Sequence, residues 1–223
     1  MSTYTEYRDT RLTRIPQVSG LYAWYYRPRV VNRESIVKTL SRFFASESRI
    51  TTSVHQRYGV KLVGSSAGEV VFGSDEGSVQ SAMTDAFTNA EPFLEHFFAS
   101  HYFAHFCRPI YIGIAKNLYD RVYCQHYVSL TDYWQDESGV SRYLSANGDA
   151  TVQQVMDTLD LSHSFALEAR VRGIAPSELS VSILETDQIP DSIGSDATNN
   201  ESTTRRALER LLQLLADPIC GRR

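Results

Sequence analysis

Residues 111–121 read YIGIAKNLYDR, a stretch in which the pattern changes from that of a strand to that of a helix. Pro109 to Gly113 is a short run typical of a β-strand, with the glycine as its punctuation. Leu118 to Val128 then follows a helical pattern. The sequence therefore predicts a strand that carries Tyr111, joined by a short connection to a helix that carries Arg121.

The same reading extends outward to both ends of the chain. Pro16 to Tyr26 is a turn followed by an aromatic, β-rich run that contains Gly20-Leu21-Tyr22, and Leu179 to Leu184 alternates as a strand. Helical patterns cover residues 34–46, 78–106, 151–172 and 204–216, a β-hairpin is predicted around residues 64–68, and residues 129–150 and 187–204 are polar connectors. This organisation predicts a mixed α/β protein.

Composition limits the class of protein. The chain has 223 residues, of which 42% are hydrophobic and 22% are charged, so it is long enough to bury a core and is not disordered throughout. No apolar run is long enough to span a bilayer, and residues 1–9 are too polar for a secretory signal. Three cysteines without paired spacing exclude a disulfide scaffold. We expect a soluble protein of the cytoplasm that does not associate with membranes.

The net charge of −4 conceals a segregation along the chain. Residues 1–61 carry a net charge of +7 and residues 202–223 one of +3, whereas residues 127–201 carry −10. Basic segments can build an anion-binding face on an acidic protein, and Arg27, Arg29 and Arg33 are candidates for contacts with DNA phosphates. Charge alone leaves open the alternative that these arginines are solvated.

Four short motifs occur in an order that resembles the signature of the GIY-YIG nuclease superfamily. Gly20-Leu21-Tyr22 and Tyr111-Ile112-Gly113 match its two strand motifs, Arg121 follows Tyr111 by ten residues, and Glu209 precedes Pro218 by nine. The resemblance implies a single domain, residues 1–223, with a small, mainly antiparallel sheet flanked by helices. Its core would comprise residues 15–26, 108–126 and 178–223. Residues 27–107 would form a helix, hairpin and helix insertion between the two tyrosine motifs.

The resemblance implies a divalent-metal-dependent endonuclease of the restriction type that hydrolyses phosphodiester bonds in DNA, with a homodimer as one arrangement. The sequence leaves RNA open as an alternative substrate. In this interpretation Glu209 holds Mg²⁺ or Mn²⁺, and Arg121 contacts the phosphate. Tyr22 is the general base, and Tyr111 supplies an orienting hydroxyl. His126 is a competing base. The chain departs from the family pattern at Gln125, where a histidine is common, and at Gly221, where an asparagine is common.

Other functions remain open at this point. The departure at Gly221 and the net acidity favour a catalytically weak member that binds nucleic acid or a protein, and a structure-specific repair nuclease is a third alternative. His101 and His105 have the spacing of a shared zinc site, with His96 and Cys107 nearby. The aromatic residues around them instead favour a packed structural helix.

Overall fold

The computed structural model describes residues 5–28, 96–100, 103–185, 209–216, 218 and 220, apart from the side chain of residue 105. Residues 1–31 and 92–223 belong to one compact unit. The predicted helix over 34–46 and the hairpin around 64–68 lie outside the described residues, as do Arg29 and Arg33.

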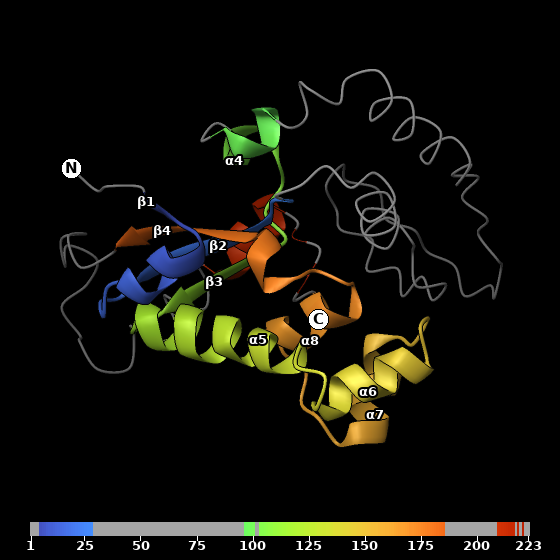
Figure 1. Ribbon diagram of the computed structural model, residues 1–223. Helices are drawn as coiled ribbons and strands as arrows, with labels where there is room; N and C mark the ends of the chain where they lie inside the picture. The colour runs from blue at the N-terminus through green and yellow to red at the C-terminus, as the bar shows by residue number, and fades with distance from the viewer. Residues whose placement is uncertain are drawn as a thin grey trace, which may run out of the picture. The chain divides into compact units, whose positions relative to one another are not determined.

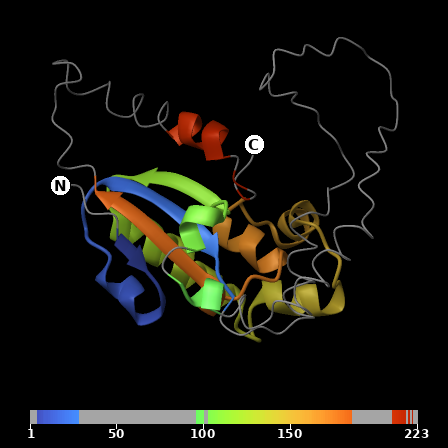
Figure 2. The same ribbon diagram turned by 90° about the horizontal axis from the view of Figure 1, so that it is seen from above.

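A small antiparallel sheet forms the centre of this unit. Its strands are β1 (Thr5–Tyr7), β2 (Gly20–Tyr26), β3 (Tyr111–Ala115) and β4 (Leu179–Glu185), and they lie side by side in the order β1-β4-β2-β3 (Figure 2). All three pairings are antiparallel. The expected class, a mixed α/β protein with a small antiparallel sheet and helices, is therefore confirmed. β1 was not predicted, and β3 begins two residues later than expected.

Helices follow each strand of the sheet. They are η1 (Asp9–Arg14), α4 (Phe103–Phe106), η2 (Tyr119–Val128), α5 (Ser129–Tyr133), α6 (Gly139–Ala146), α7 (Val152–Leu159), α8 (Phe165–Val171) and η3 (Pro176–Glu178), and residues 209–216 are also helical. η2 and α5 form one continuous helix along a face of the sheet (Figure 1). No helix in the described part of the chain is long and apolar enough to cross a membrane.

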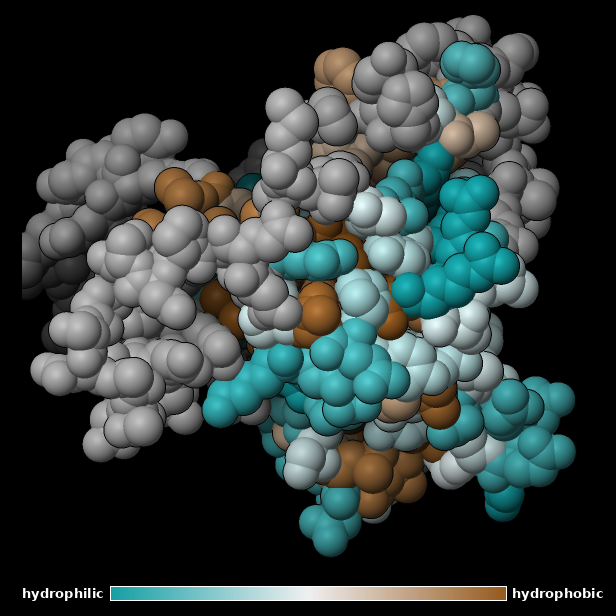
Figure 3. Space-filling view, turned by 90° about the vertical axis from the view of Figure 1, so that its left-hand side faces the viewer, coloured by the Kyte–Doolittle hydropathy of each residue, from teal (hydrophilic) through white to brown (hydrophobic). Residues whose placement is uncertain are grey.

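The core lies between the sheet and the helices η2 and α8. Trp24, on β2, is fully buried and stacks on Phe165 of α8, with 5.4 Å between ring centroids. Val181 and Ile183 of β4 pair with Trp24 and Tyr22, so all four side chains share one face of the sheet. Hydrophilic side chains make up much of the described outer surface in one view (Figure 3). The buried aromatic residues of β2 thus join the sheet to its helical layer.

The expectation that residues 129–150 form a loop is wrong, because they contain α5 and α6. α6 begins where the Ser138 side chain accepts a hydrogen bond from the backbone N–H of Ser141. Val140 then packs with Val155 of α7 and Leu167 of α8 in a second cluster of buried residues. The sequence did not predict α6 because polar residues separate the few apolar residues that form its buried face.

Arg27 is buried next to the end of β2, where its side chain connects this strand to β1 and to residues 99–100. Its guanidinium forms an ion pair with Glu6 of β1 and donates hydrogen bonds to the backbone carbonyls of Ala99 and Ser100, each at 2.6 Å. Its side chain is also 5.8 Å from the ring centroid of Phe103. The hypothesis that Arg27 contacts DNA phosphates is therefore wrong, because its donors are used inside the protein.

Replacing Arg27 with alanine should lower the free energy of unfolding by about 3–5 kcal/mol, since removing one partner leaves Glu6 and several carbonyls unpaired. The exposed Arg11 is a matched control, and Arg11→Ala should change stability by less than about 0.5 kcal/mol. Urea unfolding curves of both variants measure the difference. Equal stability of the two variants would contradict an anchoring role for Arg27.

Candidate active site

Tyr22 and Tyr111 meet because of the register between β2 and β3. Trp24 pairs with Tyr111 and Tyr22 pairs with Gly113, so the two tyrosines lie on the same face of the sheet. Their rings stack with centroids 6.1 Å apart and planes at 23°. The Tyr22 side chain is 2% exposed, whereas Tyr111 is half-buried.

Gly113 has no side chain because the ring of Tyr22 occupies that space. A Cβ atom at this position would lie 2.5 Å from Cζ of Tyr22, far inside van der Waals contact. Gly20 is constrained in the same way, since its Cβ would be 2.6 Å from both Leu118 Cδ1 and the carbonyl oxygen of Leu184. The glycines of both strand motifs are therefore steric requirements of this packing.

The helix η2 supplies Arg121 and His126. Its ten residues have π-helical geometry, in which hydrogen bonds connect residues five apart in place of the four of an α-helix. Arg121 and His126 are five residues apart, so successive turns of this helix bring both toward the tyrosines. Residues with π-helical geometry are frequent at functional sites.

His126 is held in one orientation beneath the tyrosines. Its Nδ1 atom accepts a hydrogen bond of 3.1 Å from Nε1 of Trp24. Its ring edge meets the rings of Tyr22 and Tyr111, with centroid distances of 5.5 and 5.2 Å. Burial, and secondarily the charge of Arg121, lowers the pKa of His126 to about 3. His126 is therefore a neutral ring whose proton resides on Nε2.

Arg121 is the charged group at the centre of the site. Its guanidinium interacts electrostatically with the hydroxyls of Tyr22 and Tyr111, and its Nη1 donates a hydrogen bond to Oε1 of Gln125 at 2.6 Å. Burial is the main cause that raises the pKa of Tyr22, and Tyr111 adds to it, while Arg121 acts in the opposite direction. The net shift is upward, so Tyr22 is protonated at neutral pH.

Glu209 comes from the helical residues 209–216 and lies within the electrostatic range of Arg121. Burial raises the pKa of the Glu209 carboxyl, and the positive charge of Arg121 partly offsets that increase. Oε1 of Glu209 accepts a hydrogen bond of 3.4 Å from Gln213. Just beyond this helix the backbone N–H of Cys220 donates to the carbonyl of Ile110 at 2.7 Å, which ties the segment to the start of β3.

The structure thus groups four of the residues singled out in the sequence, Tyr22, Tyr111, Arg121 and His126, and places the fifth, Glu209, within electrostatic range of Arg121. They come from β2, β3, η2 and the C-terminal helical segment. Sequence reasoning missed two residues that support them, Trp24 and Phe165. Trp24 was accessible from the alternation of β2, because it lies two residues from Tyr22 on the same face. Phe165 carries no local signal.

A single half-buried carboxylate fits a hydrated Mg²⁺ ion, which is commonly held by one or two carboxylates and substrate phosphates. Glu209 is the residue here that offers such a ligand, and burial makes its negative charge costly, a cost that Arg121 offsets only in part. Among the described residues, no group of three or more His, Cys, Asp and Glu forms a metal cluster.

The histidine pair proposed for zinc gains no support from the described part of the chain. His101 and the side chain of His105 lie outside it. Cys107 is half-buried, and burial raises the pKa of its thiol to about 11, which disfavours the thiolate that zinc requires. The rings of Phe97, Phe98 and Phe103 pack together there, with Phe97 and Phe103 centroids 5.4 Å apart.

Comparisons with known proteins find no relative of this chain: no family model, curated protein or solved structure matches it. The function is therefore argued from the site itself.

The lowered pKa of His126 predicts a loss of stability in acid. Below pH ~6.5 the unfolded chain protonates this histidine while the folded chain does not, so folding becomes less favourable as the pH falls. Between pH 6.5 and 5 this protonation should lower the free energy of unfolding of the wild type by about 1.5 kcal/mol. His126→Phe lacks the histidine and should not show this part of the loss, so the measurement compares the pH dependence of unfolding in the two proteins.

His163→Gln, at a partly exposed histidine on a different segment, serves as the control and should keep the acid-dependent loss. An NMR titration of the wild type gives an independent measurement. A His126 ring that protonates near pH 6.5 would contradict the buried, neutral state.

Proposed function

We propose that this protein is a divalent-metal-dependent endonuclease that hydrolyses phosphodiester bonds in DNA. The observation that carries the proposal is the convergence of two tyrosines, an arginine and a glutamate from four separate segments of the chain. This set combines a phosphate-binding cation, a metal-binding carboxylate and hydroxyls that can orient water. These are the groups that phosphodiester hydrolysis needs.

Arg121 is suited to bind the phosphate that is cleaved. Its planar guanidinium presents several donors in a fixed geometry that matches the non-bridging oxygens of a phosphate. Tyr22, Tyr111 and Gln125 hold it in place, so little conformational entropy is lost when a phosphate binds. Negative charge that develops on the phosphate in the transition state is stabilised by this preorganised cation.

Glu209 is the residue that would hold the metal ion. A bound Mg²⁺ supplies Lewis-acid stabilisation of the phosphate and of the departing oxygen. Glu209 lies close enough to Arg121 to interact with its charge, so the carboxylate and the phosphate-binding group belong to one site.

The geometry favours Tyr22 over His126 as the group that exchanges a proton with the attacking water. Nδ1 of His126 already accepts the Trp24 hydrogen bond and its Nε2 carries the proton, so neither ring nitrogen can accept a proton from water and His126 positions the tyrosines instead. Tyr22 donates a hydrogen bond while protonated and acts as a base once its proton leaves. Arg121 favours that loss because its charge lowers the pKa of Tyr22 against the effect of burial.

A second candidate function is nucleic-acid binding without cleavage. The observation that favours it is the upward net shift of the Tyr22 pKa, which opposes its use as a base. Gly221, the position that first raised this alternative, lies outside the described residues. Restriction-type specificity and a homodimer that reads a symmetric site are part of the proposal.

Glu209→Gln should lower the rate of plasmid nicking in Mg²⁺ by about 100-fold or more, because the amide loses the charge that holds the metal. DNA affinity measured in chelator should stay close to that of the wild type. Glu137→Gln, which removes an exposed carboxylate after α5, is the control and should nick at the wild-type rate. A wild-type protein that binds the plasmid but leaves it intact in Mg²⁺ would favour the binding function.

Arg121→Lys should lower the nicking rate by about 10- to 100-fold although the positive charge is kept, since lysine lacks the planar fork. Arg142→Lys makes the same exchange at an exposed position of α6 and should have no effect. Rates are compared at saturating DNA. Full activity of Arg121→Lys together with inactivity of Arg121→Ala would reduce the role of this residue to charge alone.

A further inference from the structure

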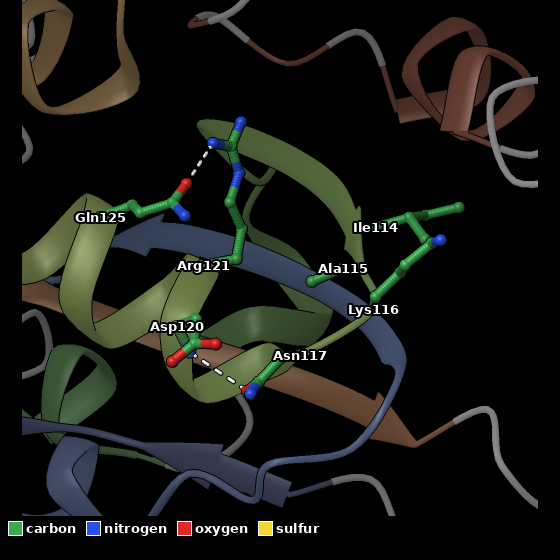
Figure 4. A pocket seen from close by; sticks show the side chains of 7 residues that line it. All are labelled: Ile114, Ala115, Lys116, Asn117, Asp120, Arg121 and Gln125. Atoms are coloured by element: carbon green, nitrogen blue, oxygen red, sulfur yellow. Dashed lines mark hydrogen bonds between the residues drawn. The ribbon is translucent and has the colours of Figure 1, made fainter. Parts of the chain in front are cut away.

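A groove open to solvent lies beside the proposed site, between the end of β3 and the start of η2 (Figure 4). Its volume is about 300 Å³, at the low end of the range for ligand pockets. The residues that line it are Ile114, Ala115, Lys116, Asn117, Asp120, Arg121 and Gln125. An open space of this size suits one unit of an extended chain that continues beyond it.

Several polar groups of the groove interact with other groups of the protein. Oδ1 of Asn117 accepts a hydrogen bond of 3.2 Å from the backbone N–H of Asp120, and Oε1 of Gln125 accepts from Arg121. Arg121 is also engaged by the tyrosines of the site. These interactions fix the positions of Asn117, Gln125 and Arg121 along the groove.

Lys116 differs from its neighbours. Its side chain is exposed, and it makes no hydrogen bond or ion pair with any residue that the structure describes. In Figure 4 it extends from the end of β3, with Ala115 between it and Arg121, while Asp120 lies next to Asn117. The ammonium group of Lys116 is thus a cation at the same groove as Arg121, and its charge is available to an anion.

We propose that this groove binds a second phosphate of the DNA backbone, next to the phosphate held by Arg121, and that Lys116 is its ligand. The inference rests on the proposed function, because Arg121 defines where the cleaved phosphate lies. Phosphates recur along a strand at short, regular intervals, so a strand on Arg121 brings another phosphate to a neighbouring cation. A flexible lysine binds it as a point charge and fixes the register of the strand.

The experiment measures the affinity for a short fluorescein-labelled DNA duplex in EDTA, by fluorescence anisotropy, at several salt concentrations. Lys116→Ala should weaken binding about fivefold and reduce the slope of log affinity against log salt by about one unit, as expected for one lost phosphate contact. Lys116→Arg should keep the wild-type slope. Asp120→Asn should bind more tightly, because it removes a negative charge from the groove. Arg142→Ala, on α6, should keep the wild-type slope.

Cleavage kinetics separate this inference from the proposed function. In Mg²⁺, Lys116→Ala should raise KM and leave kcat unchanged, since it binds a phosphate that does not react. An unchanged salt slope and an unchanged KM in an active nuclease would overturn the subsite and leave the proposed function standing. If the wild-type protein does not cleave DNA but Lys116→Ala still reduces the slope of log affinity against log salt, the proposed function is overturned and the phosphate subsite stands.

Discussion

The hydrogen bond from Nε1 of Trp24 to Nδ1 of His126 is the interaction on which the site depends. Both groups are buried, and a buried polar atom without a partner is costly, so each stabilises the position of the other. The bond joins β2 to η2 and sets the tautomer of His126. The two tyrosines then pack on the edge of that ring, which determines where their hydroxyls meet Arg121.

Space is the second constraint, and it explains why the two strand motifs contain glycine. A glycine inside a strand contributes no packing and weakens the sheet. Here Gly113 makes room for the ring of Tyr22, and Gly20 makes room for Leu118, which precedes η2. The same absence of side chains that destabilises the strands therefore allows the helix and the tyrosine to approach the sheet closely.

Sequence reasoning found the parts of the fold with strong local signals. β2 and β4 are rich in aromatic and alternating residues, and both occur where they were predicted. β1 was missed because its three residues carry too short a pattern, and α6 because four of its eight residues are Gly, Ser or Arg. The sequence predicted a helix here but not its π-helical geometry, because the pattern of apolar residues does not distinguish the two kinds of helix. That geometry gives a physical account of why the histidine follows Arg121 by five residues.

The charges of the site are unfavourable for stability and favourable for binding anions and cations. Burial raises the pKa of Glu209, so the fold bears a cost for keeping this carboxylate charged, whereas burial keeps Tyr22 protonated. A purely structural cluster would be more stable with apolar side chains at these positions. Local conflicts of this kind are typical of functional sites, where ligands complete the electrostatics. The charge of Arg121 lowers the pKa of both groups against the effect of burial, which couples the carboxylate and the hydroxyl through one guanidinium. A phosphate that binds Arg121 therefore changes the proton affinity of Tyr22 and of Glu209 at the same time.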